Sequence, residues 1–411
     1  MKHSALIAIL YIGIFLISAP AGQAKFAMIQ TREVPISRLI KNLEAMRADA
    51  IGSMDKALVD FRIGRLHAMA YAEKTELAPT DVHNTPGSQF ELPEFGHRPD
   101  HSQFQVVPAK SAAKEASAKA HLKEAIKFLT AALNADSSLL AAKLGLAWCY
   151  EQGGDTSKAL ALYREVFKES YLIDKDSKGG MRGWSISVET AQYLRKLLDP
   201  EKDKKELAKI NQQAAEVEKL PRYVTPIMIP LTERVELPHL VVDRRVSFDL
   251  DGFGRRDYTT WLSEEAGWLV FDRHGAGQIT SGLQLVGQSS FWIFWKNGYE
   301  VLAGLDDDRN GVLQAGELDG LAVWHDRNIN GVSEPGEVKS LAELRICALH
   351  TGSKLHASGI QFNPSGIRYN DGKTAPSYDL ILHSAGKTVV QRPHPANAIK
   401  APFAVKTVPL F

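Results

Sequence analysis

Cysteine is scarce in this sequence of 411 residues, which contains only Cys149 and Cys347. Two cysteines exclude a scaffold built from disulfides, and we expect both to be free thiols. An excess of one charge is also missing, because 49 Lys and Arg residues stand against 48 Asp and Glu residues. The composition therefore describes an ordinary globular chain with room for two or three domains, and nothing in it indicates a nucleic-acid partner.

Long apolar runs are absent after the N-terminal segment, so no stable membrane insertion is expected. At the N-terminus, Lys2 precedes an apolar stretch over residues 5–19, and the small residues Gly22 and Ala24 follow. This pattern predicts a signal peptide over residues 1–24 that is cleaved after Ala24. An uncleaved membrane anchor is the alternative, but the stretch is short of the roughly 20 residues that cross a bilayer. The mature protein is thus expected to be exported, either periplasmic or secreted.

Residues 25–219 are rich in Ala, Leu, Lys and Glu, and their apolar residues return every three or four positions. This period predicts amphipathic helices, including a pair over residues 38–46 and 58–72. Two sets of residues have the spacing of helical packing positions and resemble tetratricopeptide repeats: Ala125, Leu129 and Ala132, then Leu146, Ala147, Tyr150, Gly154, Ala159, Tyr163 and Val166. Such a helical stack usually binds a protein or peptide partner on its concave face, although it can also serve only as a spacer.

Prolines and glycines mark two interruptions. Residues 79–107 contain Pro86, Pro93 and Pro99, which predict a loop insertion within the helical region. Residues 220–240 contain four prolines and predict a linker. Beyond the linker we expect a small domain over residues 241–352, with strands and a tail over residues 353–411. Five of the seven tryptophans lie between Trp261 and Trp324, and a core for that domain explains them better than a sugar site.

Two consecutive acidic segments in this small domain have the residue types and spacing of EF-hand calcium loops. Calcium prefers six to eight oxygen ligands, which a twelve-residue loop supplies from positions 1, 3 and 5, the position 7 carbonyl, often a water at 9 and a Glu at 12. In the first segment these ligands are Asp306, Asp308, Asn310, the Val312 carbonyl and Glu317. In the second they are Asp326, Asn328, Asn330, the Val332 carbonyl and Glu337. Gly311 and Gly331 occupy the sixth positions, where the chain turns sharply.

The interval between the two segments predicts their role. Only residues 318–325 separate them, so we expect one helix of two turns to connect the loops. A calcium sensor needs two full helices that swing apart there. We therefore expect Ca²⁺ to stabilise a compact α+β, EF-hand-like domain rather than to switch its shape.

Two earlier segments are incomplete versions of the same loop. One begins at Asp249 and has Phe253 where an oxygen ligand is expected, and the other begins at Asp272 and carries Gln284 near its far end. These segments lack several acidic positions. Whether they bind a metal is left open by the sequence.

The stretch over residues 241–349 resembles the calcium-binding modules of bacterial RTX-type secreted proteins, including their self-processing module. The segments that carry the resemblance are Phe248 to Gly254, Trp268 to Gly277, Asn297 to Leu305, Leu305 to Glu317 and Trp324 to Leu344. It implies calcium ligation by the side chains already named in the two complete loops. It covers about a quarter of the chain.

The sequence supports two enzymatic hypotheses less well than calcium binding. The self-processing relatives cleave an Asp-Pro bond, but the one such bond here, Asp199-Pro200, lies where a proline would simply end a helix. A metal hydrolase using His97, Asp100 and His101 would need a helix that Gly96 and Pro99 disfavour.

We therefore expect a multidomain, exported and non-enzymatic protein, with all-α tetratricopeptide-like helices for protein interaction and a calcium-stabilised C-terminal domain. The alternative is a calcium-dependent self-processing or adhesion component.

Overall fold

The structure is a computed structural model that describes residues 34–80, 106, 108–177, 181–182, 184–233, 235–250 and 256–384. The expected signal peptide and most of the 79–107 insertion, with its histidines, lie outside the described residues. The same holds for Phe253 and for the end of the tail after residue 384. None of the helices within the described ranges combines the length and apolar character needed to cross a membrane.

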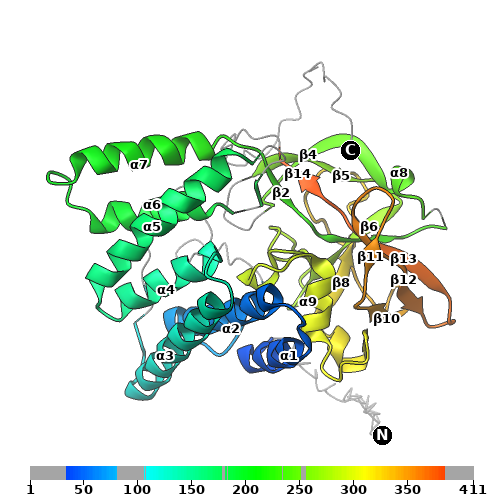
Figure 1. Cartoon of the computed structure of the whole chain (residues 1–411). Coiled ribbons are helices and arrows are strands. Elements are labelled where there is room, and N and C mark those ends of the chain that lie inside the picture. The colour runs from blue at the N-terminus through cyan, green and yellow to red at the C-terminus, as the bar shows by residue number, and fades with distance from the viewer. Residues whose placement is uncertain are drawn as a thin grey trace, which may run out of the picture. The chain divides into compact units, whose positions relative to one another are not determined.

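Helices dominate the first half of the described chain, as the sequence predicts (Figure 1). They are α1 (Ile36–Asp49), α2 (Ser53–Glu73), α3 (Ala112–Ala135), α4 (Leu140–Gln152), α5 (Thr156–Lys175), α6 (Ile186–Leu197) and α7 (Lys204–Val217). Polar caps begin three of them, because Ser111, Asp155 and Ser185 accept the backbone N–H three residues ahead.

Successive helices from α2 to α7 pack against one another. Helices α2 and α3 approach closely at Gly64, where an added Cβ would lie 2.8 Å from Leu129 Cγ. The buried positions Ala125, Ala159 and Tyr163 were all expected to pack. The helical class is therefore confirmed, while the assignment to tetratricopeptide repeats stays a prediction.

The second half is built mainly from strands. They are β1 (Met181–Arg182), β2 (Arg222–Val224), β3 (Ile227–Pro230), β4 (Val241–Phe248), β5 (Asp257–Leu262), β6 (Ala266–Phe271), β7 (Val312–Gln314), β8 (Leu321–Trp324), β9 (Val338–Ser340), β10 (Ile346–His350), β11 (Lys354–Leu355), β12 (Gln361–Tyr369), β13 (Thr374–Asp379) and β14 (Leu382–His383). Short helices interrupt them: α8 (Leu237–Leu240), η1 (Ser290–Trp292), α9 (Gly298–Leu305) and η2 (Ala315–Leu318).

The largest sheet has the order β7-β10-β12-β13-β3-β6-β8-β9, and β11 pairs with β12. Neighbouring strands in it run antiparallel, and the sheet curls (Figure 1). The expected EF-hand-like α+β domain is therefore wrong. The two acidic segments flank different strands of the curled sheet instead of forming paired helix-loop-helix units, because β7 pairs with β10 while β9 pairs with β8.

The helix expected over residues 318–325 is also wrong. Residues Leu321–Trp324 form strand β8, whose four side chains are all buried, and η2 before it is a single short turn. Val323 and Trp324 favour strands, and a continuously buried run of four residues suits the middle of a sheet better than a two-turn helix. Tertiary contacts with β6 and β9 therefore decide the secondary structure of this segment.

The segment 220–240 was expected as a linker, but it contains β2, β3 and α8. Strand β3 is fully buried and lies between β13 and β6 in the sheet. Further along, the strands expected after residue 353 are confirmed, and β12 and β13 form a hairpin whose turn includes Asn370 to Gly372.

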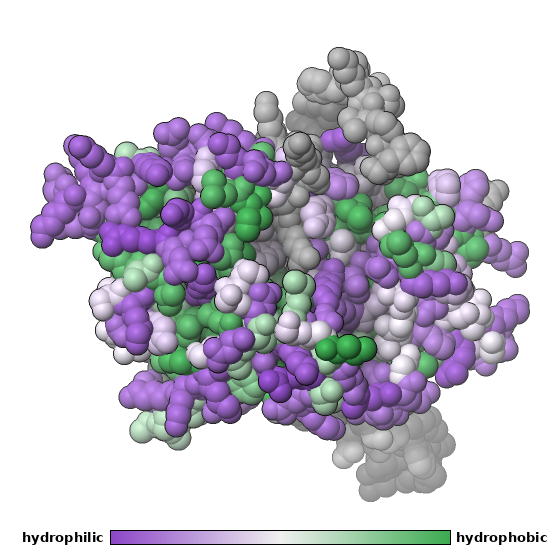
Figure 2. All heavy atoms as spheres, in the orientation of Figure 1, coloured by the Kyte–Doolittle hydropathy of each residue, from purple (hydrophilic) through white to green (hydrophobic). Residues whose placement is uncertain are grey.

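The expected aromatic core is confirmed. All five tryptophans in question are fully buried: Trp261, Trp268, Trp292, Trp295 and Trp324. Cys149 and Cys347 are free, also as expected. One hydrophobic cluster combines α1 and α2 residues such as Leu39 and Leu66 with sheet and α9 residues such as Val323 and Leu302. The face shown in Figure 2 is mostly hydrophilic, with small apolar patches over both the helical and the strand half.

Candidate metal-binding site

Loop 1, which spans Asp306 to Glu317, follows directly after α9 and contains β7. The Asp306 carboxylate accepts the backbone N–H groups of Asn310 at 3.2 Å and Gly311 at 2.8 Å. Arg309 and Gly311 have positive φ angles of 61° and 83°. This tight turn directs backbone N–H groups and side-chain oxygens toward the loop centre. Glycine adopts the backbone conformation that the sixth position requires at no steric cost.

Three carboxylates converge in loop 1. One oxygen from each of Asp306, Asp308 and Glu317 lies within 4.8 Å of those from the other two. Asp306 is buried, Glu317 is half-buried and Asp308 is exposed. Burial raises the pKa of Asp306, the nearby Glu317 charge adds to this shift, and the Gly311 N–H opposes it. The cluster is therefore electrostatically unfavourable for its own charges and suits a cation.

The other expected ligands of loop 1 have local roles. Asn310 Oδ1 accepts the Val312 N–H at 2.8 Å, and its amide nitrogen donates to Asp308 at 2.9 Å. The two Glu317 oxygens accept the N–H groups of Asp307 and Gln314 at 2.7 and 3.0 Å. These bonds hold the ends of the loop together across the site.

Loop 2, which spans Asp326 to Glu337, connects β8 to β9 and repeats this pattern. The carboxylate of Asp326 accepts the N–H groups of Asn330 and Gly331 at 3.1 and 2.7 Å. Glu337 accepts the N–H groups of Arg327 and Glu334, both at 3.1 Å. Ile329 and Gly331 have positive φ angles of 57° and 69°, the same positions in the loop as in loop 1.

The remaining expected ligands of loop 2 are amides and a carbonyl. Asn328 and Asn330 direct their amide nitrogens to Glu334 at 2.9 and 3.2 Å. Asn330 Oδ1 also accepts the Val332 N–H at 2.7 Å, and the Val332 side chain is exposed. Loop 2 therefore has a similar backbone but places fewer carboxylates in its centre.

The segment from Asp272 to Gln284, called the Asp272 loop here, has the same backbone turn. Asp272 accepts the N–H groups of Ala276 and Gly277 at 3.0 Å each, and φ is positive at Gly275 (62°) and Gly277 (66°). The loop thus keeps the conformation of the complete loops even though it lacks their second and third oxygen ligands.

Gln284 closes the Asp272 loop with an amide. Its Oε1 accepts the Thr280 N–H at 2.8 Å, as the closing glutamates accept the equivalent N–H in loops 1 and 2. Its Nε2 donates to the Gln278 carbonyl at 2.7 Å. Gln278 is the seventh residue of this loop, whose carbonyl would face an ion in a complete loop. The amide N–H of Gln284 therefore contacts the carbonyl that a bound cation would contact in a complete loop.

Several residues around the loops were missed by the sequence analysis. Trp261 Nε1 donates to Asp326 at 2.7 Å, and Arg244 donates to the Asn328 carbonyl at 3.1 Å. On loop 1, Arg38 and Asn42 of α1 contact Asp307. These partners are distant in sequence, and no motif marks them.

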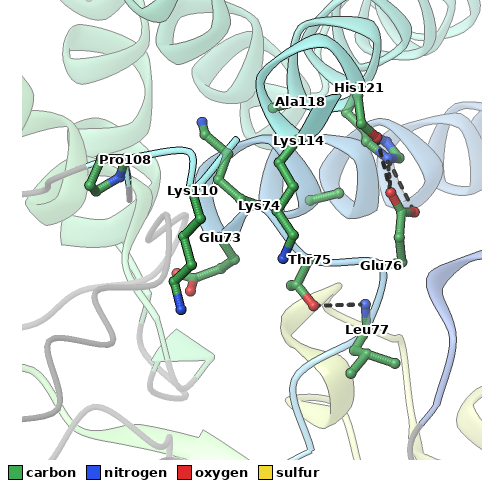
Figure 3. Close-up of a pocket in the computed structure, with 12 residues that line it drawn as sticks. Glu73, Lys74, Thr75, Glu76, Leu77, Pro108, Lys110, Lys114, Ala118 and His121 are labelled. Atoms are coloured by element: carbon green, nitrogen blue, oxygen red, sulfur yellow. Dashed lines mark hydrogen bonds and ion pairs between the residues drawn. The ribbon is translucent and has the colours of Figure 1, made fainter. Parts of the chain in front are cut away.

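A pocket of about 600 Å³ lies between the end of α2 and the start of α3. Figure 3 shows Lys110, Lys114 and Glu73 around it, with His121 directed at Glu76. His121 Nε2 lies 3.0 Å from Glu76 Oε1, and His121 Nδ1 lies 2.8 Å from Nδ1 of His67. Burial lowers the pKa of His67 to about 4. The pocket therefore combines positive and negative side chains beside a neutral histidine.

Comparisons with known proteins locate the loops within a recognised region. Residues 236–383 match the SPM domain family, and this range includes both complete loops. The chain is also similar to the Iron-regulated protein FrpA of Neisseria meningitidis serogroup C, with 33% identity over 145 residues. That similarity covers 33% of this chain and 13% of FrpA, so the chain spans only a small part of this relative.

Proposed function

We propose that this protein binds Ca²⁺ in loops 1 and 2 and that the ions stabilise the curled sheet. The observation that carries the proposal is the convergence of three carboxylates, within 4.8 Å, in loop 1. Carboxylate, amide and backbone oxygens are the hard donors that Ca²⁺ prefers, and Mg²⁺ fits less well because it demands a strict octahedron and retains its waters. Bound Ca²⁺ supplies the positive charge that compensates these carboxylates.

The position of the loops supports a stabilising role. Loop 1 follows α9 and contains β7, and loop 2 joins β8 to β9, so each ion would bind beside strands of the same sheet. A sensor exposes a groove when a helix pair opens. Strand β8 occupies the segment in which a sensor would have its second helix. Ion binding therefore contributes to the folding free energy and does not open a groove.

We propose that the chain is exported. The N-terminal pattern of residues 1–24 and the resemblance to calcium-binding modules of secreted bacterial proteins support this. The partial similarity to a meningococcal protein is consistent with a bacterial chain of this kind. Sequencing of the mature N-terminus should return Lys25, and recovery of Met1 would contradict the proposal.

We further propose that the helical region contacts a protein or peptide, with the pocket between α2 and α3 as its docking point. Lys110 and Lys114 offer positive charge there, while Glu73 and Glu76 offer negative charge. A pull-down with wild type and with a Lys110→Glu, Lys114→Glu variant, each with and without chelator, would test this. If wild type and the double variant captured the same partner equally well, the assignment of this pocket as the docking point would be wrong.

No catalytic role is part of the proposal. The Asp199 carboxylate accepts the N–H groups of Glu201 and Lys202 at 2.9 and 3.0 Å, and these bonds lower its pKa. This is the behaviour of a residue that shapes the turn between α6 and α7. Mass spectrometry of the purified chain in Ca²⁺ should therefore show it intact, and fragments ending at Asp199 would favour self-processing instead.

Thermal melting of the full mature chain tests the calcium proposal directly. At a free Ca²⁺ concentration about a hundred times the Kd, each site should contribute roughly 2.7 kcal/mol. We expect chelator to lower the Tm of wild type and to leave the Glu317→Gln, Glu337→Gln double variant unchanged. A Glu233→Gln, Glu236→Gln variant removes two exposed charges outside the loops and should respond as wild type does. A wild-type Tm that ignores chelator would refute stabilisation.

A further inference from the structure

Helix α1 reaches loop 1 across more than 250 residues of sequence. Arg38 Nε lies 2.9 and 3.0 Å from the two carboxylate oxygens of Asp307, the residue between the first two expected ligands. Asn42 Nδ2 donates to the same carboxylate at 2.8 Å. Farther along α1, Asp49 pairs with Arg309 in the same loop. Three positions along one helix thus contact loop 1.

The same α1 residues also cap the helix that carries loop 1. Arg38 Nη2 donates to the Leu305 carbonyl at 2.8 Å, and Asn42 Nδ2 donates to the Gly304 carbonyl at 3.0 Å. The last carbonyls of a helix lack partners within it, so α1 satisfies two such groups of α9. Asp306, the first expected ligand, directly follows Leu305. The direction in which α9 ends therefore sets the position of Asp306.

The contact of Arg38 and Asn42 with Asp307 orients loop 1 but does not add to the negative electrostatic field of its other carboxylates. The guanidinium of Arg38 pairs with the Asp307 carboxylate, and the amide of Asn42 donates to the same group. Arg38 thereby compensates the charge of Asp307, which does not belong to the cluster of three carboxylates in the loop. The contribution of α1 is geometric, and a charge-neutral change at Asn42 should reveal it.

Loop 2 provides an internal comparison. Strand β8, not a helix, leads into it, and the side chains that reach it from other elements include Trp261 on β5 and Arg244 on β4. Within the described residues, the contacts of α1 reach Asp307 and Arg309 of loop 1. Any coupling between ion binding and α1 should therefore distinguish the two loops.

We propose that α1 is part of the loop 1 metal site: Arg38 and Asn42 are positioning residues, and ion binding and docking of α1 stabilise each other. This inference rests on the proposed calcium function. Because coupling between two binding events is reciprocal, an ion that favours docked α1 must be bound more tightly when α1 is docked. The α1 segment would then report the occupancy of loop 1 but not that of loop 2.

Hydrogen exchange of the full mature chain tests the first direction. In wild type, Ca²⁺ should slow exchange of the α1 amides about tenfold or more, the change expected for a coupling of about 1.4 kcal/mol. Glu317→Gln should lose this protection, and Glu337→Gln should keep it. Equal behaviour of the two variants would overturn the inference.

Calcium titration tests the reverse direction. Asn42→Ala and the charge-preserving Arg38→Lys should weaken the loop 1 step several-fold and leave the loop 2 step unchanged. Ser37→Ala, an exposed and charge-neutral change on the same helix, is the matched control and should titrate as wild type does. If Asn42→Ala unfolds, Arg38→Lys still decides the question. Calcium binding without any response of α1 would overturn only this inference, whereas no calcium binding in wild type would overturn the proposed function as well.

Discussion

Single residues at the ends of the loops set the expected order of calcium affinity. Loop 1 brings together three carboxylates, from Asp306, Asp308 and Glu317, whereas loop 2 has Asn328 at the position that corresponds to Asp308. Affinity in such loops rises with the number of charged ligands. Pro335 stiffens loop 2 and Glu334 adds a further carboxylate there, and both oppose the difference.

We expect Glu317→Gln to abolish the tighter binding step, because it removes the closing charge of loop 1. Glu337→Gln should weaken only the second step, because it removes the closing charge of loop 2. Calorimetric titration with calcium would separate the two steps. The ranking is reversed if the tighter step survives in Glu317→Gln and disappears in Glu337→Gln.

Asp379 should make stability depend on pH. Its carboxyl is buried at the start of α9, where it accepts the Gly298 N–H at 2.8 Å, and burial raises its pKa to about 8. An unfolded Asp loses its proton near pH 4. Between about pH 4 and pH 8 the folded state therefore holds a proton that the unfolded state has released, and stability falls as pH rises through this window.

Asp379→Asn should remove this dependence, because the amide keeps an acceptor for Gly298 and does not ionise. We expect the unfolding free energy of the variant, relative to wild type, to increase with pH by up to about 1.4 kcal/mol per pH unit across the window. Urea unfolding between pH 4 and pH 9 would measure it, with chelator present to exclude effects of the metal loops. A difference between the two chains that stays constant with pH would contradict the assignment.

At the level of elements, the Asp272 loop shows how a loop of this shape can close without an ion. Gln284 supplies an acceptor for Thr280 and a donor for the Gln278 carbonyl. In the sequence, Gln284 lies near the far end of this segment. That position does not reveal that the amide N–H takes the place of a cation, because this depends on which carbonyl the side chain contacts.

Gln284→Glu should destabilise the protein in chelator by about 1–3 kcal/mol, since the Gln278 carbonyl loses its donor. Added Ca²⁺ should restore part of this loss, because the new carboxylate lies in a loop that already holds Asp272. Thermal melting with and without Ca²⁺ would show both effects. Gln278→Glu makes the same charge change at an exposed side chain of the same loop and should have little effect. An equal loss in both variants would contradict the role of Gln284.

Element boundaries divide into those that local sequence predicts and those it does not. The caps of α3, α5 and α6 and the hairpin at Gly372 follow from residues next to one another in the chain. Strand β8 and strand β3 were missed because their state is decided by neighbours in the sheet. A short apolar run such as Leu321–Trp324 is compatible with either helix or strand until its partners are known.

At the level of the whole molecule, the sheet does not end where the composition changes. Strand β3 lies within the segment expected as a linker, and it pairs through Met228 with Tyr378 on one side and Trp268 on the other. The side chains of Ile227, Met228 and Ile229 are all buried. A fragment that starts after β3 therefore lacks a central strand of its own core.

We expect a fragment of residues 220–411 to melt cooperatively and a fragment of residues 235–411 to lack a cooperative transition. Removal of β3 leaves the facing edges of β6 and β13 unpaired and opens a cavity in the core. Circular dichroism melts of both fragments in Ca²⁺ would check this. The full mature chain should be more stable than either, because α1 and α2 share the core. Equal cooperative melting of the two fragments would contradict a central role for β3.

The sequence by itself determined the candidate metal loops, since the oxygen donors, turn glycines and closing glutamates of each lie within twelve successive residues. It also determined the helical class of the first half, because helical periodicity is a local property. Only the tertiary structure decided that the loops belong to a curled antiparallel sheet and that β3 completes it. The contacts of Arg38, Asn42 and Trp261 with the loops depend on the same long-range packing. Residues that are tens to hundreds of positions apart meet only when the chain folds, and no spacing within the sequence encodes such a meeting.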